Sequence, residues 1–438
     1  MRFPYDAVVF DLDGTLFEAE EGIVSSVKKA MADLGLPIPA QVDLRQVIGP
    51  PLYEFFLNPL QVPEERAGKA MELYRDDFFH RGRFLYSVYP GIRLLLRSLR
   101  AAGVYVALAT SKPLGLAQAI LTDFYMDGYF DRIVGETADH RVKMGKPELI
   151  RQALPATYGR AAMVGDRRFD MEGASKAGID GIGVLYGYGT RDELEKAGAT
   201  AIVETTEDLW RLLCPDCQKP CGFFLTVEGP DGSGKTTQVN RLEKSLLKYG
   251  FDVQRTREPG GCSISEKIRQ IILDPANEEM CDTCEALLYA AARAQHVHQV
   301  IRPAVEKGKL LLSDRFVDSS VAYQGSGRGL GIATVQQINA PAVDHMLPDA
   351  TLYLSIDARQ ALARRLAVSE PDRLESQAVS FHQRVQQGYE QLIAQNPERF
   401  LVVDASKDAD TVAREALRAV LDRVVTYEGG RIPWKESL

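Results

Sequence analysis

Two segments constrain the fold more than any other feature, because each is a short apolar run that ends in a turn dense with polar groups. Residues 7–10 run into Asp11-Leu-Asp-Gly-Thr15, and residues 223–227 run into Gly229–Thr236. Further apolar runs alternate with helical stretches, at 104–109, 161–164, 309–312 and 351–356. This alternation predicts parallel sheets with crossover helices, twice over. We therefore expect an α/β protein with two doubly wound parallel-sheet domains.

The 438 residues are too many for one ordinary core, so we expect an N-terminal domain over 1–213 and a C-terminal domain over 222–438. Residues 17–88 show a helical pattern with Pro-rich breaks, which predicts a helical cap inserted after the first strand. Residues 214–221 form a cysteine-rich linker whose Pro separates the two patterns.

Bulk composition excludes several classes of partner. The net charge of −8 argues against general attraction to nucleic acid or to anionic membranes. No run of 18 apolar residues is present, and the N-terminus lacks the long apolar stretch of a signal peptide. We therefore expect a cytoplasmic protein with no nucleic-acid or membrane partner. Phosphate substrates stay open, because a pocket needs only a few local cations.

The first polar turn predicts a site for a divalent cation and a phosphoryl group. Asp11 and Asp13 repel each other unless a cation or a shared proton compensates, and Mg²⁺ is an oxygen-seeking cation that would do so. Three later strand ends and turns add ligands for a metal or a phosphate, namely Thr110, Lys146, Asp166 and Asp170. For the first motif alone, an Asp-rich turn without chemistry is the alternative.

Together these strings resemble the haloacid dehalogenase superfamily over roughly residues 5–210, nearest to phosphoglycolate-phosphatase-like and 5′-nucleotidase-like members with a Rossmann-like core. The resembling strings include Phe10–Leu16, Gly49–Leu52, Ala109–Pro113, Val164–Arg167 and Gly183–Gly189. The resemblance implies a Mg²⁺-dependent phosphomonoester hydrolase acting on a small phosphate ester or nucleotide. It implies Asp11 as the nucleophile that becomes an aspartyl-phosphate, and Asp13 as general acid and then base.

The same resemblance implies that Thr110 and Lys146 hold the transferring phosphoryl group. The implied Mg²⁺ ligands are Asp11, Asp13, Asp166 and Asp170. A degenerate domain kept for interaction or dimerisation is the alternative, although the intact set of candidate residues argues against it.

Gly229-Pro-Asp-Gly-Ser-Gly-Lys-Thr236 fits a phosphate-binding P-loop. Its glycines let backbone N–H groups face the phosphates of ATP, and the following helix adds its positive N-terminal end. Lys235 would reach the β- and γ-phosphates, and the Thr236 hydroxyl would bind Mg²⁺. The predicted ATP-binding residues are Gly229, Pro230, Asp231, Gly232, Ser233, Gly234, Lys235, Thr236 and Thr237.

Other strand ends indicate a pocket for a phosphate acceptor. Asp314 can approach Mg²⁺ through water, and Arg315 can grip an acceptor phosphate. Tyr289 and Arg293 stand four residues apart and share a helix face, so one can stack on a flat base while the other hydrogen-bonds it. The alternative from another functional class is an ATP-binding switch that transfers no phosphate. A pocket for a phosphate acceptor argues against that alternative.

These stretches resemble thymidylate kinase over residues 222–425. The resembling strings are Glu228–Gln238, Arg257–Gly261, Ala292–His296, Ser313–Ser320, Ala322–Gly325 and Gly327–Leu330. The resemblance implies transfer of the ATP γ-phosphate to dTMP and a homodimer through the kinase domain. It implies dTMP-binding roles for Asp231, Arg257, Glu258, Tyr289, Arg293, Arg315, Tyr323 and Gln324. The alternative within the same enzyme class is a kinase that phosphorylates another nucleoside monophosphate.

A mobile lid is expected at residues 364–375, because family members without a P-loop arginine usually carry basic residues there. Arg365 and Arg373 are the candidates for transition-state charge, and solvation of a surface helix is the alternative for Arg365. Two Cys-x₂-Cys pairs have zinc spacing, Cys214 with Cys217 and Cys281 with Cys284. The alternative is that these cysteines are free thiols that bind no metal.

Overall fold

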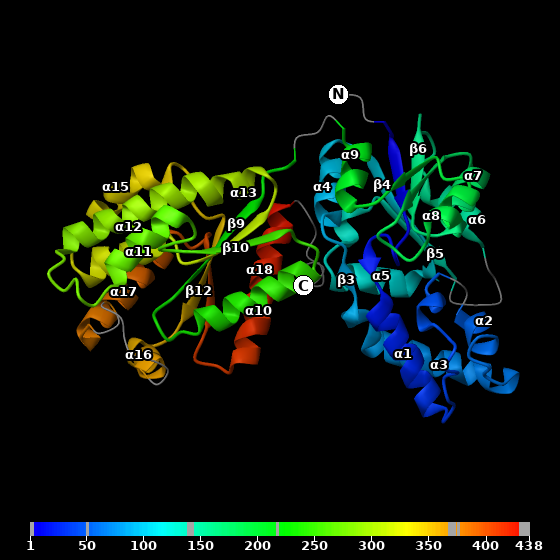
Figure 1. The fold of residues 1–438 in the computed structure, drawn as a ribbon, viewed down its shortest axis with the longest axis horizontal. Helices are drawn as coiled ribbons and strands as arrows, with labels where there is room; N and C mark the ends of the chain where they lie inside the picture. Colours follow the sequence, from blue (N-terminus) through cyan, green and yellow to red (C-terminus); the bar gives the residue numbers. More distant parts are fainter. Residues whose placement is uncertain are drawn as a thin grey trace. The chain divides into compact units, whose positions relative to one another are not determined.

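The computed structural model describes residues 4–49, 52–137, 144–215, 219–366, 374 and 377–428. These residues form two compact units (Figure 1), the first mainly up to residue 215 and the second over 219–247 and 251–427. Each unit holds its own parallel sheet, which confirms the predicted fold class.

The first unit contains a six-stranded sheet in the order β5-β4-β1-β6-β7-β8, with every pair parallel. Its central strand β1 is completely buried, as expected for an apolar strand covered on both faces. The strands are β1 Ala7–Phe10, β4 Tyr105–Pro113, β5 Arg132–Glu136, β6 Ala161–Gly165, β7 Asp180–Val184 and β8 Ala201–Val203. The covering helices are α4 Ile92–Ala101, α5 Leu114–Asp123, α6 Lys146–Ala153, α7 Arg168–Ala177, α8 Arg191–Lys196 and α9 Thr206–Leu213.

A helical cap leaves the sheet after β1 and returns before α4. Its helices, blue in Figure 1, gather on one side of the core. A small antiparallel ribbon, β2 Phe17–Glu18 with β3 Ser87–Val88, forms both connections. The cap helices are α1 Glu20–Asp33, η1 Leu44–Val47, α2 Leu52–Leu57, α3 Glu64–His80 and η2 Gly82–Leu85.

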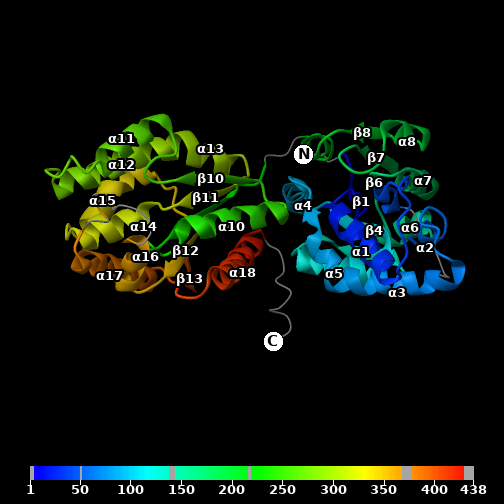
Figure 2. The same cartoon turned by 60° about the horizontal axis from the view of Figure 1, so that its bottom comes forward.

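The second unit contains a five-stranded parallel sheet in the order β10-β11-β9-β12-β13. Helices α10 and α18 lie side by side (Figures 1 and 2), and Arg241 of α10 pairs with Asp410 of α18 at 2.6 Å. The strands are β9 Phe223–Glu228, β10 Val253–Arg257, β11 Leu310–Asp314, β12 Ala350–Ser355 and β13 Phe400–Asp404. The helices are α10 Lys235–Lys248, α11 Ser263–Leu273, α12 Asp282–His296, η4 Val297–Ile301, α13 Arg302–Glu306, α14 Val317–Ser320, η5 Val321–Gly327, α15 Ile332–Val343, α16 Ala358–Leu366, α17 Val379–Gln395 and α18 Ala409–Tyr427.

In both sheets the chain moves first to one side of the opening strand and later to the other. Ligands of doubly wound sheets bind beyond the carboxyl ends of the strands at such a switch point. The polar turns that follow β1 and β9 lie there, so the fold positions both motifs where a ligand is expected.

Candidate active sites

The first site is assembled by the register of three neighbouring strands. Phe10 of β1 lies opposite Leu108 of β4 and Val164 of β6, so all three strands end at the same edge. The Asp11 amide continues the ladder and donates to the Val164 carbonyl at 2.9 Å. This register brings Asp11, Thr110 and Asp166 together, although they are distant in sequence.

Three carboxylates and one ammonium group form the centre of this site. Oxygens of Asp11, Asp166 and Asp170 lie within 4.8 Å of one another. The Lys146 Nζ is 2.5 Å from Asp11 Oδ1 and 2.6 Å from Asp170 Oδ1. Burial raises the pKa of Asp11 to about 7 against the opposing charge of Lys146, and burial also raises the pKa of Asp166 well above its usual range. A hard divalent cation fits this donor set, because it would neutralise the excess negative charge.

Asp13, also predicted as a metal ligand, is paired with a second lysine. Its Oδ2 lies 2.9 Å from the Nζ of Lys112, and that nitrogen sits 4.8 Å from the ring centre of Phe78. Asp13 Oδ1 is buried without a hydrogen-bond partner in the described part of the chain. A carboxylate in this position is suited to proton exchange with a leaving group. Lys112 belonged to a resembling string but had received no role.

A cavity of 400 Å³ opens above these residues. The core contributes Thr110 and Lys112 to its walls, while the cap contributes mostly apolar or aromatic side chains such as Tyr53 and Met71, with Arg75 among them. A substrate in this cavity would therefore place its phosphate toward the core and its remaining group toward the cap.

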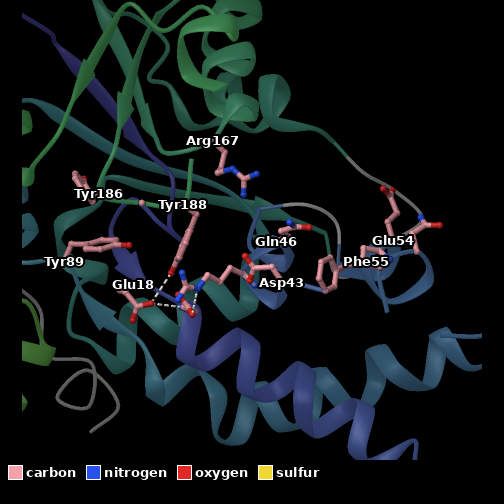
Figure 3. A pocket seen from close by; sticks show the side chains of 14 residues that line it. Glu18, Asp43, Gln46, Glu54, Phe55, Tyr89, Arg167, Tyr186 and Tyr188 are labelled. Atoms are coloured by element: carbon pink, nitrogen blue, oxygen red, sulfur yellow. Dashed lines mark hydrogen bonds and ion pairs between the residues drawn. The ribbon is translucent and has the colours of Figure 1, made fainter. Parts of the chain in front are cut away.

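A second, wider cavity of 890 Å³ lies beside the first, and Figure 3 shows its aromatic and acidic lining. The Tyr188 hydroxyl donates to Glu18 Oε1 at 3.2 Å, and the Tyr188 amide donates to Asp166 Oδ2 at 2.8 Å. Arg167 lines both cavities and donates from the core to the Ile48 carbonyl of the cap. Tyr188 therefore connects Glu18 of β2 with Asp166 of the acidic centre, and Arg167 connects the core with the cap.

The second site begins at the loop between β9 and α10. Gly232 has φ +85°, and a Cβ there would lie 1.9 Å from the Ala361 carbonyl, so only glycine fits this turn. The buried Lys235 Nζ donates to the carbonyls of Gly229 and Pro230 at 3.0 and 2.9 Å. Asp314 of β11 lies opposite Val227 of β9, which places the Asp314-Arg315 pair beside the same loop.

Arg315 connects the loop to the acceptor pocket. Its guanidinium pairs with Asp231 and lies 2.9 Å from Ser319 Oγ and 3.3 Å from the Tyr323 hydroxyl. Burial alone would raise the pKa of Asp231, but Arg315 and Lys235 outweigh burial and hold that pKa well below its usual range. Burial, with the nearby charge of Arg315, lowers the pKa of Lys235 to about 8. A buried cation, Lys235, and a partly buried one, Arg315, face one carboxylate and form a site suited to anions.

The acceptor pocket is a cavity of 140 Å³ between α12, η5 and the loop after β10. Gln324 lines it, and its Oε1 is buried without a hydrogen-bond partner among the described residues. The Arg293 guanidinium is also in the lining, but all its nitrogens already have acceptors, namely Glu258, Ser320, Asn339 and the Phe316 carbonyl. In this state Arg293 offers a bound base its charge and flat face, while Gln324 offers a free acceptor. The lining includes Asp231, Glu258, Tyr289, Arg293, Arg315, Tyr323 and Gln324.

Of the residues predicted to bind dTMP, Arg257 does not line this pocket. Arg257 is exposed and pairs with Glu266 at 3.0 Å, outside the cavity lining. Thr236 and Thr237 are exposed in the first turn of α10. Arg365 lies on α16, and its backbone nitrogen is close to Gly232. Arg373 falls outside the described residues.

Two families match the chain, one in each half. Residues 227–416 match the thymidylate kinase family, and residues 8–184 match the haloacid dehalogenase-like hydrolase family. A thymidylate kinase of Lactobacillus delbrueckii subsp. bulgaricus is 51% identical over 202 residues, covering 45% of this chain and 95% of that protein. One from Bacillus pumilus is 49% identical over 203 residues, covering 46% and 96%. The chain belongs to the thymidylate kinase family through its C-terminal half.

The N-terminal half is a haloacid dehalogenase-like hydrolase domain. Among solved structures, a predicted phosphatase from Clostridium acetobutylicum is 39% identical, with 47% of this chain and 97% of that chain covered and a TM-score of 0.43. A putative phosphatase from Clostridium difficile is 36% identical, with 48% and 98% covered and the same TM-score.

The thymidylate kinase half contains buried groups that the sequence analysis left without a role. Glu228, at the end of β9, accepts from the Phe316 amide at 2.7 Å and from the Tyr389 hydroxyl at 2.8 Å. His296 contacts Glu258 through Nδ1 at 3.0 Å and thereby braces the carboxylate that holds Arg293. The sequence signals for these two residues were their places in the resembling strings Glu228–Gln238 and Ala292–His296, and the position of Glu228 just before the P-loop.

The cysteines of the thymidylate kinase half and of the linker do not form a metal cluster in the described part of the chain, where Asp11, Asp166 and Asp170 are the grouping found. Cys214 is buried in the core of the hydrolase unit. Cys281 and Cys284 are exposed at the start of α12. Cys217 falls outside the described residues. Over those same described ranges, no helix has the length and apolar character needed to cross a bilayer.

Proposed function

We propose that the C-terminal unit transfers the γ-phosphate of ATP to dTMP and forms dTDP. The observation that carries this proposal is Arg315, which contacts the P-loop through Asp231 and the acceptor cavity through Tyr323 and Ser319. A cation in that position can hold the acceptor phosphate next to the phosphate that is transferred. Charge stabilisation and alignment supply most of the catalysis in phosphoryl transfer.

The remaining roles follow from position. Lys235 and the P-loop backbone would hold the ATP phosphates, while Thr236 and Asp314 would hold the Mg²⁺ that accompanies them. Gln324 would accept from the thymine N3–H through its free Oε1, and Tyr289 would pack against the base. Arg365 and Arg373 would supply charge to the transition state when the lid closes over the nucleotides.

The kinase proposal is tested by mixing the full-length protein with ATP, Mg²⁺ and each nucleoside monophosphate in turn. We expect dTMP to give the highest kcat/KM for ADP release. ATP consumption that no acceptor accelerates would instead indicate a P-loop module without phosphotransfer. Preference for another monophosphate would correct the substrate and leave the reaction class in place.

We propose that the N-terminal unit hydrolyses phosphomonoesters through an aspartyl-phosphate on Asp11. The observation that supports this is the pair of opposed carboxylates: Asp11 sits with Lys146 among the acidic groups, while Asp13 is paired separately with Lys112. Asp11 would attack phosphorus, and Asp13 would protonate the leaving oxygen and then activate water. Thr110 and Lys146 would hold the phosphoryl oxygens. Asp11, Asp166 and Asp170 would bind Mg²⁺, which neutralises charge as phosphate approaches.

A small phosphate ester or a nucleotide is the proposed substrate class of this hydrolase. Release of phosphate from a panel of such esters, with and without Mg²⁺, tests the proposal. We further propose domain limits of 1–213 and 222–438 joined by a linker at 214–221, a homodimer through the kinase unit, and a cytoplasmic location. Size measurement by light scattering checks the dimer.

A further inference from the structure

The amide of Gln324 is held in one orientation by an ion pair that does not line the acceptor cavity. Gln324 Nε2 donates to Glu285 Oε1 at 3.0 Å. Glu285 is fully buried, and its two oxygens accept from Arg328 Nε at 3.3 Å and Nη2 at 3.0 Å. The Arg328 backbone amide also donates to the Tyr323 carbonyl at 2.8 Å, which fixes the residue at the end of η5.

This arrangement determines which end of the amide is left free. The oxygen and nitrogen ends of a glutamine amide have nearly the same shape, so packing alone selects neither. A carboxylate paired with Arg328 accepts hydrogen bonds only, so it attracts the NH₂ end and repels the carbonyl end. The carbonyl oxygen is the end left over, in agreement with the absence of a partner for Gln324 Oε1 within the described residues.

We propose that the Glu285–Arg328 pair is a positioning device that sets the base selectivity of the kinase site. With the carbonyl free, the site takes a pyrimidine with an N–H donor at ring position 3, as in thymine. Cytosine has an acceptor at that position and would face the carbonyl oxygen lone pairs. Glu285 also precedes Tyr289 and Arg293 by four and eight residues on α12, so one helix face carries the device and the pocket lining. This inference rests on the kinase function proposed above.

The test compares dTMP and dCMP as acceptors for the full-length protein and for Glu285→Gln. A glutamine at 285 can rotate and donate to Gln324 Oε1, which releases the NH₂ end toward the base. We expect the ratio of kcat/KM for dTMP over dCMP to fall by at least about tenfold, mainly through KM. Asp282→Asn is the matched control, because Asp282 lies 3.4 Å from Arg328 at the same helix end but is half-buried, and Gln324 is not among its hydrogen-bond partners in the described residues. Its ratio should equal that of the unmodified protein.

Arg328→Gln is a second test of the same pair, because it removes the charge that holds Glu285. It should also lower the ratio of kcat/KM for dTMP over dCMP. An unchanged ratio in both variants, with dTMP turnover retained, overturns the inference. Loss of turnover with both nucleotides in both variants also counts against it, because an orientation device alters selectivity rather than catalysis. Equal use of dTMP and dCMP by the unmodified protein would instead refute the proposed substrate of the kinase.

Discussion

The two sites use the same edge of the same kind of sheet with opposite electrostatics. In the hydrolase site, Asp11 and Asp170 pair with Lys146 beside Asp166, and burial raises the pKa values of Asp11 and Asp166. In the kinase site, Lys235 and Arg315 converge on Asp231, whose pKa is lowered while that of Lys235 is lowered too. Excess buried negative charge favours a cation, and excess buried positive charge favours an anion.

The difference follows from what each site must bring to a phosphate. In the mechanism proposed above, the hydrolase uses an anionic nucleophile of its own, so it needs a cation to reduce repulsion between that carboxylate and the phosphate. The kinase supplies no nucleophile and must hold two anionic substrates together, so its own side chains carry the positive charge. If this contrast is right, changes in one site should leave the other reaction nearly unchanged.

The largest expected effect comes from Asp11→Asn. Removing the nucleophile should lower phosphate-ester hydrolysis by about 10⁴-fold or more, since an amide cannot form the aspartyl-phosphate. Mg²⁺-dependent release of p-nitrophenol and dTMP-dependent ADP release are measured on the same preparation. The second rate should stay within about twofold, because Asp11 lies in the other unit. Asp33→Asn is the control, because Asp33 is an exposed carboxylate of α1 that pairs with Lys29. Full hydrolysis by Asp11→Asn would refute the covalent route.

Arg315→Lys should lower dTMP-dependent kcat/KM by about 10²- to 10³-fold, because a point charge cannot replace a planar fork shared by Asp231, Ser319 and Tyr323. Hydrolysis of p-nitrophenyl phosphate should be unaffected. Arg241→Lys tests the substitution itself at an exposed pair with Asp410. A kinase that tolerates the change would show that Arg315 does not hold the acceptor phosphate.

The sequence predicts the main members of both sites because they follow strands. Apolar runs ending at Asp11 and Asp166 reach the same edge of the first sheet, where strand register alone brings the two residues together. The run ending at Asp314 reaches the corresponding edge of the second sheet, beside the loop that follows β9. What the sequence does not show is the pairing of side chains within that edge. The contacts of Asp13 with Lys112 and of Gln324 with Glu285 depend on rotamers and on helix packing, and neither has a fixed spacing. Arg293 is a further example. The sequence predicts the helix face on which it lies, but not that all its guanidinium nitrogens already donate hydrogen bonds within the protein.

Mg²⁺ alone should distinguish the two sites without any nucleotide. At about 100 times its Kd, Mg²⁺ should stabilise the hydrolase unit by about 3 kcal/mol, since it binds the folded acidic cluster and not the unfolded chain. Hydrogen exchange of peptides from residues 4–215 should slow, while exchange over 251–366 should change little. Asp170→Asn should remove most of the effect. Equal slowing in both units would mean that the ion acts generally and not through the cluster.

The smallest effect concerns the pH dependence of ATP binding. A Lys235 pKa of about 8 in the free protein means that the ammonium form is lost as pH rises above 8. Bound phosphates favour the charged form, so ATP binding above pH 8 must take up a proton, and affinity should fall about tenfold between pH 7 and pH 9. With an ordinary lysine pKa near 10.5 the affinity would be flat over that range.

Calorimetry in two buffers of different ionisation enthalpy measures this proton uptake directly. Arg315→Gln is the informative variant, because the positive charge of Arg315 is one of the two causes that lower the Lys235 pKa, the other being burial. Removing that charge should raise the pKa and move the loss of affinity to higher pH. An unmodified protein that binds ATP equally at pH 7 and pH 9, without proton uptake, would mean that Lys235 stays charged. Repulsion between Lys235 and Arg315 would then be too weak to deprotonate Lys235. The electrostatic contrast with the hydrolase site would in that case depend on the carboxylates alone.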